Sequence, residues 1–133
     1  MRPTFRSEDW AHYRRVNERF AEAVRSEVNS DDPIALVQDY HFALVPALIR
    51  IRLPAATVIM FWHIPWPNSE RVGICPWRQE ILEGLLGSSI LGFHTQLHYN
   101  NFLDSVWILW IVTSKPASIG NKTAWSCAAI ALW

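Results

Sequence analysis

Apolar residues along the first 106 positions alternate between two spacings, one typical of amphipathic helices and the other of short buried strands. From Trp10 to Val28 they recur every three or four positions, behind Ser7 as a capping residue and two early acids, which predicts a helix. Runs of strand length follow at 34–38, 56–63 and 88–93. Helical spacing marks the segments 42–53, 77–87 and 95–106.

This alternation predicts an α/β fold with a parallel sheet. Pro46 suits the first turn of the second helix, and Gly87 suits the end of the third. In such sheets ligands bind at the carboxyl ends of the strands, where the loops into the helices gather. Polar clusters occur at these three points, namely 38–41, 63–68 and 94–96.

The composition narrows the classes of function. A chain of 133 residues has room for one domain, and twelve basic against twelve acidic side chains give no basic surface for nucleic acid. Cys75 and Cys127 lack the spacing of a zinc site or a disulfide framework, so a cytoplasmic protein without a metal is expected. The longest apolar run, "VWILWIV", is far short of the roughly 20 residues of a membrane span, and the charged N-terminus does not read as a secretory signal.

Five motifs in close succession carry a resemblance to a known family. They are "DYH" (39–41), "HIPWPN" (63–68), "ICPWRQEIL" (74–82), "LLGSSILGFHT" (85–95) and "NNFLDSV" (100–106). Over residues 2–106 the sequence resembles the trehalose-6-phosphate synthases and the similar glucosylglycerol-phosphate synthases of glycosyltransferase family 20. The resemblance implies a retaining transferase with two Rossmann-like domains in the GT-B arrangement, of which residues 1–106 would form part of the first. It implies neither a metal nor a cofactor.

The resemblance also implies two site residues, which we predict to be both catalytic and substrate-binding. Asp39 matches an acceptor-side aspartate that hydrogen-bonds sugar hydroxyls, and His63 matches a histidine that contacts the donor glucose near the reacting carbon. A carboxylate can fix the acceptor by accepting two hydroxyl hydrogen bonds. An imidazole can hold the donor sugar beside a developing oxocarbenium ion without attacking it.

Other interpretations of these residues remain open. Asp39 could cap a helix, and His63 could donate to a backbone carbonyl, as ordinary loop residues do. Glycoside hydrolysis would require a second carboxylate beside Asp39, and Glu70 or Glu80 could be proposed, but no local pattern singles out either.

The aromatic residues and the remaining histidines of the motifs are expected to be structural. Trp62, Trp66 and Trp77 could stack on sugar faces, but indoles beside prolines more often pack in a core. His41 and His94 are expected to support their loops, His41 by fixing the one that presents Asp39.

By family, the expected reaction transfers glucose from UDP-glucose to glucose-6-phosphate, with a nucleotide sugar and a sugar phosphate as partners. A glucosylglycerol-phosphate synthase using ADP-glucose and glycerol-3-phosphate is the alternative, and a non-catalytic binding fragment is another. The family's acceptor-phosphate loop would precede Arg2, and its donor-binding domain would follow Val106. Because both are absent, the 133-residue chain is expected to be inactive.

The segment 107–133 departs from the family pattern and is predicted to be an aberrant tail. Trp-Ile pairs at 107–108 and 110–111 are encoded TGG-ATH, which one nucleotide earlier reads as Leu, Met or Val followed by Asp. The same earlier frame permits a charged helical segment of the kind that the family shows here, so a shifted reading frame would explain the tail. The alternative is that "WILWIV" and "CAAIALW" are genuine strands.

Overall fold

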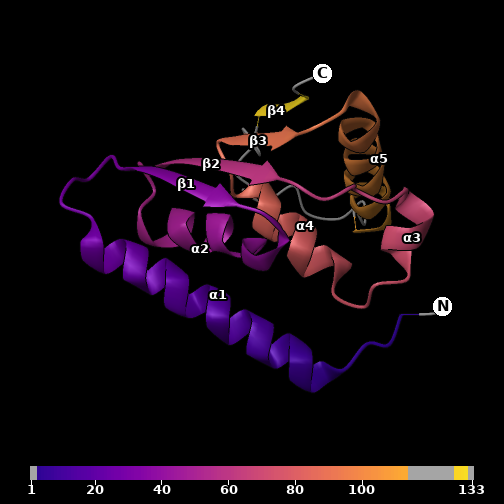
Figure 1. The fold of residues 1–133 in the computed structure, drawn as a ribbon, viewed down its shortest axis with the longest axis horizontal. Coiled ribbons are helices and arrows are strands. Elements are labelled where there is room, and N and C mark those ends of the chain that lie inside the picture. The colour runs from indigo at the N-terminus through magenta and orange to yellow at the C-terminus, as the bar shows by residue number, and fades with distance from the viewer. Residues whose placement is uncertain (1–2, 114–127, 132–133) are drawn as a thin grey trace.

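The computed structural model describes residues 3–113 and 128–131 (Figure 1). In chain order the elements are α1 (Ser7–Glu27), β1 (Ile34–Gln38), the 3-10 helix η1 (Tyr40–Phe42), α2 (Val45–Arg52), β2 (Thr57–Trp62), α3 (Ser69–Gly73), α4 (Arg78–Leu86), β3 (Ile90–Phe93), α5 (Gln96–Thr113) and β4 (Ala128–Ala131).

The strands form one parallel sheet in the order β1-β2-β3-β4. Gln38 at the end of β1 pairs with Phe61, and Trp62 at the end of β2 pairs with Phe93, so the carboxyl ends of the first three strands lie at one rim. The predicted α/β fold is confirmed, and each of the three predicted runs contains a strand.

Two segments beyond Val106 bear on the alternative that the tail contains genuine strands. Helix α5 continues without interruption to Thr113, so this alternative is wrong at "WILWIV". Ala128–Ala131 pairs with β3 as a fourth parallel strand, in agreement with the alternative at "CAAIALW". Residues 114–127 of the predicted tail lie outside the described residues, and the frame shift stays a prediction.

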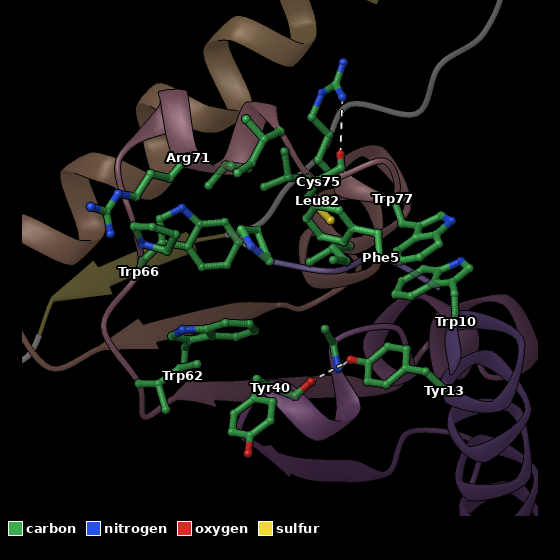
Figure 2. Close-up of a pocket in the computed structure, with 18 of the residues that line it drawn as sticks. Phe5, Trp10, Tyr13, Tyr40, Trp62, Trp66, Arg71, Cys75, Trp77 and Leu82 are labelled. Atoms are coloured by element: carbon green, nitrogen blue, oxygen red, sulfur yellow. Dashed lines mark hydrogen bonds between the residues drawn. The ribbon is translucent and has the colours of Figure 1, made fainter. Parts of the chain in front are cut away.

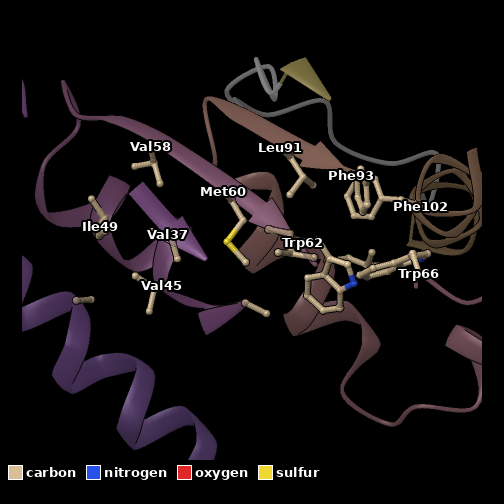
Figure 3. Close-up of a cluster of buried hydrophobic side chains, with 14 of the residues drawn as sticks. Val37, Val45, Ile49, Val58, Met60, Trp62, Trp66, Leu91, Phe93 and Phe102 are labelled. Carbon is tan, nitrogen blue, oxygen red and sulfur yellow. The ribbon is translucent and has the colours of Figure 1, made fainter. Parts of the chain in front are cut away.

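One face of the sheet carries the core. Helices α1, α2 and α4 lie on the same side of the sheet (Figure 1), as expected when successive right-handed crossovers add strands in one direction. The inward positions of β2 and β3 are fully or almost fully buried and meet Phe102 of α5 (Figure 3). These inward residues are Val58, Met60, Trp62, Leu91 and Phe93.

The opposite face of the sheet is open over the described part of the chain. On β1 the side chains of Ile34 and Leu36 are 71% and 72% exposed, while Ile59 and Phe61 of β2 are half-buried. Among the described strands β1 pairs only with β2, so its outer edge is free. Parallel sheets are normally covered on both faces. In the described part of the chain, helices therefore cover one face of the sheet, and the other face is exposed.

Helix α1 packs only in part with the apolar face that its spacing predicted. Tyr13 and Val24 of that face pack against the core. Val16 and Phe20, which share the predicted apolar spacing, are 45% and 50% exposed, whereas Asn17 and Ala21 are completely or almost completely buried. The reason is that Asn17 finds backbone partners in the interior, which a pattern of apolar residues does not reveal. Ser7 does not cap this helix either, since Arg6 occupies the capping position without a side-chain bond.

Helices α4 and α2 pack with their backbones in close approach. Pro46 lies in the first turn of α2 and Gly87 caps α4, both as predicted. A Cβ atom added at Gly87 would collide with the backbone of Ala47 and Pro46. The guanidinium of Arg50 fastens the same junction by donating to the Gly87 carbonyl at 2.9 Å and to Ser89 Oγ at 2.7 Å. No described helix has both the length and the apolar character that crossing a bilayer demands.

Candidate functional site

Asp39 occupies a strained position at the end of β1. Its φ of 69° and ψ of 170° make it the one non-glycine residue with a positive φ in the described part of the chain. The surrounding backbone holds it there, because its N–H donates to the Phe61 carbonyl at 2.8 Å and its carbonyl accepts from the Phe42 N–H at 3.1 Å. Strain of this kind persists only where neighbouring structure enforces it, and it is frequent at functional sites.

The carboxylate of Asp39 joins the first two loops of the rim. Its Oδ1 accepts hydrogen bonds from the Tyr40 N–H at 2.8 Å and from the His63 N–H at 3.3 Å. Asp39 and His63 therefore lie side by side, as the sequence predicted, and Asp39 also caps the short helix η1, as the alternative interpretation had it. Since both bonds go to Oδ1, Oδ2 is left to accept from a ligand.

The imidazole of His63 belongs to an exposed cluster of rings. Its centroid lies 4.8 Å from that of Phe61 and 5.5 Å from that of His94, which follows β3. Phe61 also meets His94 edge-on at 4.9 Å. The three predicted polar clusters thus converge at one rim, with His94 packed against the same phenylalanine that supports His63.

The charges around the site leave Asp39 unpaired in the described part of the chain. Ion pairs there join Arg14 to Glu80, and Arg25 and Arg52 to Glu22. Glu80 is bound by Arg14 at 2.9 Å and also accepts from the indole of Trp10, so it is occupied away from the rim. A hydrolytic carboxylate pair of Asp39 with Glu80 finds no support in this arrangement.

A cavity of about 920 Å³ lies beside the rim, between the start of α1, the loops after β1 and β2, and helices α3 and α4 (Figure 2). Its lining is mainly apolar and includes neither Asp39 nor His63. The aromatic residues are Phe5, Trp10, Tyr13, Tyr40, Trp62, Trp66 and Trp77. The size suits a small ligand, but the carboxylate and imidazole that could perform chemistry lie outside it.

The tryptophans of the motifs pack as predicted. Trp62 and Trp66 are buried and meet edge to face at 4.9 Å, and the Trp66 indole N–H donates to Ser105 Oγ at 3.1 Å. Trp77 is half-buried and stacks on Trp10 at 4.9 Å with nearly parallel rings. These indoles shape the walls of the loops around the site.

Two residues of α1 that bear on the site were missed by the sequence reasoning. The Tyr13 hydroxyl donates to the Tyr40 carbonyl at 2.6 Å and accepts from the Ala43 N–H at 3.0 Å. Asn17 reaches the same loop with its side-chain amide. Tyr13 falls within the apolar spacing of the first predicted helix, which says nothing of its hydroxyl. The signal in the sequence that could have revealed the contact with the loop was Asn17, a single asparagine one helical turn after Tyr13.

The hydroxyl of Tyr13 predicts a pH dependence of stability. Burial raises the pKa of Tyr13 above its ordinary value of 10.0, although hydrogen bonds with Ala43 and Asn17 oppose the shift. The unfolded chain therefore loses this proton at a lower pH than the folded chain does. The stabilisation is complete below pH 10.0 and is lost as the pH rises through the higher folded pKa. Denaturant unfolding at alkaline pH should show a shallower loss for Tyr13→Phe than for the wild type, and equal slopes would contradict the prediction.

The described residues contain no group of three or more histidine, cysteine, aspartate or glutamate side chains that could hold a metal ion. What the rim offers instead is a carboxylate oxygen free to accept hydroxyl hydrogen bonds, with an exposed imidazole next to it. This pair is suited to orienting a polyhydroxy ligand.

Comparison with known proteins identifies the family. The family model for glycosyltransferase family 20 matches residues 1–127. A trehalose-6-phosphate synthase of Mycolicibacterium gilvum is 43% identical over 123 residues, which cover 92% of this chain and 24% of that relative. A bifunctional trehalose-6-phosphate synthase/phosphatase of Thermoproteus tenax is 43% identical over 105 residues, or 77% of this chain and 14% of the relative.

Solved structures agree with the sequence comparison. The apo structure of OtsA is 29% identical with a TM-score of 0.81, over 96% of this chain and 28% of its own. An Escherichia coli structure described as bound with UDP-2-fluoro glucose is 26% identical with a TM-score of 0.80, over 96% and 28%. The chain thus spans about a quarter of the length of the M. gilvum relative. With the family model matched over nearly all of its residues, the chain belongs to glycosyltransferase family 20.

Proposed function

We propose that this chain forms part of a trehalose-6-phosphate synthase site, which transfers glucose from UDP-glucose to glucose-6-phosphate with retention. The observation that carries the proposal is the bond from the backbone N–H of His63 to Asp39 Oδ1, which joins the loops that carry Asp39 and His63 at the carboxyl rim of the sheet. The names of the relatives support trehalose-6-phosphate as the product. Uridine as the donor base is supported by the UDP-sugar in the E. coli structure, and retention by a 29% identical synthase whose structure was described in a study of transfer with retention.

In this proposal Asp39 orients the acceptor. Its Oδ1 is occupied by two backbone N–H groups, which fix the carboxylate plane. Its Oδ2 accepts a hydroxyl of the acceptor sugar and holds the attacking oxygen in place. Positioning of this kind can supply a large part of a transfer reaction's rate, because it replaces a bimolecular encounter with a fixed geometry.

His63 acts on the donor side. Its exposed ring is steadied by Phe61 and lies next to His94, so its orientation is restricted without burial. An imidazole there can hydrogen-bond a hydroxyl of the donor glucose and favour the oxocarbenium-like transition state. Neither His63 nor Asp39 needs to form a covalent bond to the sugar.

The proposal is tested in a chimera. In the M. gilvum synthase, which matches this chain over 123 residues, the part that corresponds to residues 3–106 is replaced by those residues of the chain, so that the predicted aberrant tail is left out. Transfer is measured as acceptor-dependent UDP release together with detection of trehalose-6-phosphate. The chimera is expected to be active. Asp39→Ala and His63→Ala are each expected to lower its kcat/KM by about 100-fold or more, the usual cost of losing a transition-state contact.

Matched controls separate this loss from a general disturbance. Asp104→Ala removes an exposed carboxylate from α5, and His12→Ala removes an exposed imidazole from α1. Both should keep the activity of the chimera. An Asp39→Ala chimera that folds and retains full kcat/KM would contradict the proposed role.

A further inference from the structure

We infer that Tyr13 and Asn17 of helix α1 are the positioning residues of this site, holding the loop 40–44 so that Asp39 keeps its strained conformation. The link to catalysis rests on the proposed function. The structural part of the inference rests on the hydrogen bonds described below. The hydrogen bonds that these two side chains make to the rim go to the backbone of the loop and not to Asp39 or His63. Both act through the backbone of the segment that follows Asp39.

The side chain of Asn17 makes an unusually complete set of contacts for a buried polar group. It is fully buried, and its Nδ2 donates to the Tyr13 carbonyl at 2.9 Å and to the His41 carbonyl at 3.0 Å. Its Oδ1 accepts from the Leu44 N–H at 3.1 Å. A buried amide is costly unless it is satisfied in this way. Two of the three bonds go to the loop and join the helix to it.

Tyr13 adds two bonds one turn earlier. Its hydroxyl donates to the Tyr40 carbonyl and accepts from the Ala43 N–H, and Figure 2 shows the ring directed at the loop from the side of α1. The two side chains therefore make four bonds to the backbone of residues 40, 41, 43 and 44. Loop and helix are 27 positions apart at Tyr13 and Tyr40, so no local turn preference imposes this arrangement.

The strained residue Asp39 lies directly before the loop 40–44 that Tyr13 and Asn17 hold. A positive φ at a non-glycine residue is unfavourable and must be enforced by its surroundings. On one side the ladder bond from the Asp39 N–H to the Phe61 carbonyl fixes the residue. On the other side, α1 holds the backbone of four of the five residues that follow, 40, 41, 43 and 44. If that second restraint is lost, Asp39 can relax to a negative φ and its carboxylate turns away from His63.

The test uses the 133-residue chain and reads the conformation of Asp39 by NMR. A residue with positive φ gives a strong intraresidue NOE between its amide and α protons, because that conformation brings the two close together. The wild type should show this signal at Asp39. Asn17→Leu, of similar size, should lose it, and Tyr13→Phe, which removes only the hydroxyl bonds, should weaken it. Circular dichroism identifies variants that unfold; if Asn17→Leu does, Tyr13→Phe decides the question.

Asn101→Leu is the matched control. Asn101 is a half-buried asparagine on α5 whose Nδ2 donates to the Trp66 carbonyl at 3.1 Å, so the substitution removes the same kind of bond from a different loop. It should lower the stability of the chain and leave the NOE at Asp39 intact. An undiminished NOE in folded Asn17→Leu and Tyr13→Phe would overturn the inference, as would its loss in Asn101→Leu.

A second measurement addresses the link to function. Glucose-6-phosphate is titrated into the same samples, and binding is followed at the amides of Asp39 and His63. The Asn17→Leu and Tyr13→Phe variants that fold should bind glucose-6-phosphate about tenfold more weakly than the wild type, which corresponds to a loss of about 1.4 kcal/mol of binding free energy. If the wild type shows the NOE but no binding at these amides, the acceptor role of Asp39 is contradicted. The positioning role of Tyr13 and Asn17 is then still decided by the NOE in their variants.

Discussion

The isolated 133-residue chain is expected to release no detectable UDP from UDP-glucose in the presence of glucose-6-phosphate. A polypeptide of these 133 residues spans 24% of the M. gilvum synthase and 28% of the OtsA chain. Transfer requires the acceptor oxygen and the anomeric carbon in near-attack geometry, and effective molarities of 10⁵–10⁸ M are typical of such positioning. Loss of the groups that stabilise the leaving diphosphate removes several further kcal/mol, on the order of one or two oxyanion contacts.

The measurement is a coupled assay of UDP release, run beside the active chimera at the same concentration. Product formation by the chimera shows that the assay conditions support transfer. Acceptor-dependent release of UDP by the 133-residue chain, if it disappears in the Asp39→Ala variant, would contradict the prediction. Release that does not depend on acceptor or on Asp39 would be a contaminating hydrolase.

Gly87→Ala is expected to destabilise the chain more than any surface substitution. The new Cβ would overlap the backbone of Ala47 and Pro46 at the start of α2, where no flexible side chain can move aside. Overpacking a closed core commonly costs 1–3 kcal/mol, and against backbone we expect about 3 kcal/mol or more of the free energy of unfolding. That is a large part of the roughly 5–15 kcal/mol that holds an ordinary domain together.

Gly73→Ala provides the control, because nothing lies within 4 Å of a Cβ added there. It should change the free energy of unfolding by no more than about 0.5 kcal/mol. Urea unfolding followed by circular dichroism measures both variants against the wild type. Equal midpoints for Gly87→Ala and the wild type would show that α2 and α4 are not packed as closely as described.

Local pattern was enough to predict β1, β2, β3, the longer helices and the rim where these strands end, but not the short helix α3. Alternating or helical spacing of apolar residues identifies an element when its burial depends on its own residues, as in β2. Pro46 and Gly87 were also placed correctly, since proline suits the first turn of a helix and glycine is common where a helix ends. The closeness of Asp39 and His63 followed from the topology of neighbouring parallel strands.

Contacts between distant segments could not be predicted in the same way. The burial of Asn17 depends on carbonyl and N–H groups more than twenty residues away, so the helix turned a polar residue inward and left Val16 outside. The positive φ of Asp39 has no marker in the sequence, because aspartate is common at ordinary turns. The strand at 128–131 was considered only as an alternative, because its short apolar run follows a segment without a clear period.

The open face of the sheet governs how the free chain behaves at high concentration. An edge strand offers unpaired N–H and C=O groups to any other strand, and β1 combines its free edge with exposed Ile34 and Leu36. The formal net charge of zero gives little repulsion between copies. We therefore expect self-association through β1 to compete with the folded monomer as the concentration rises. A lysine in place of Leu36 is expected to weaken this self-association.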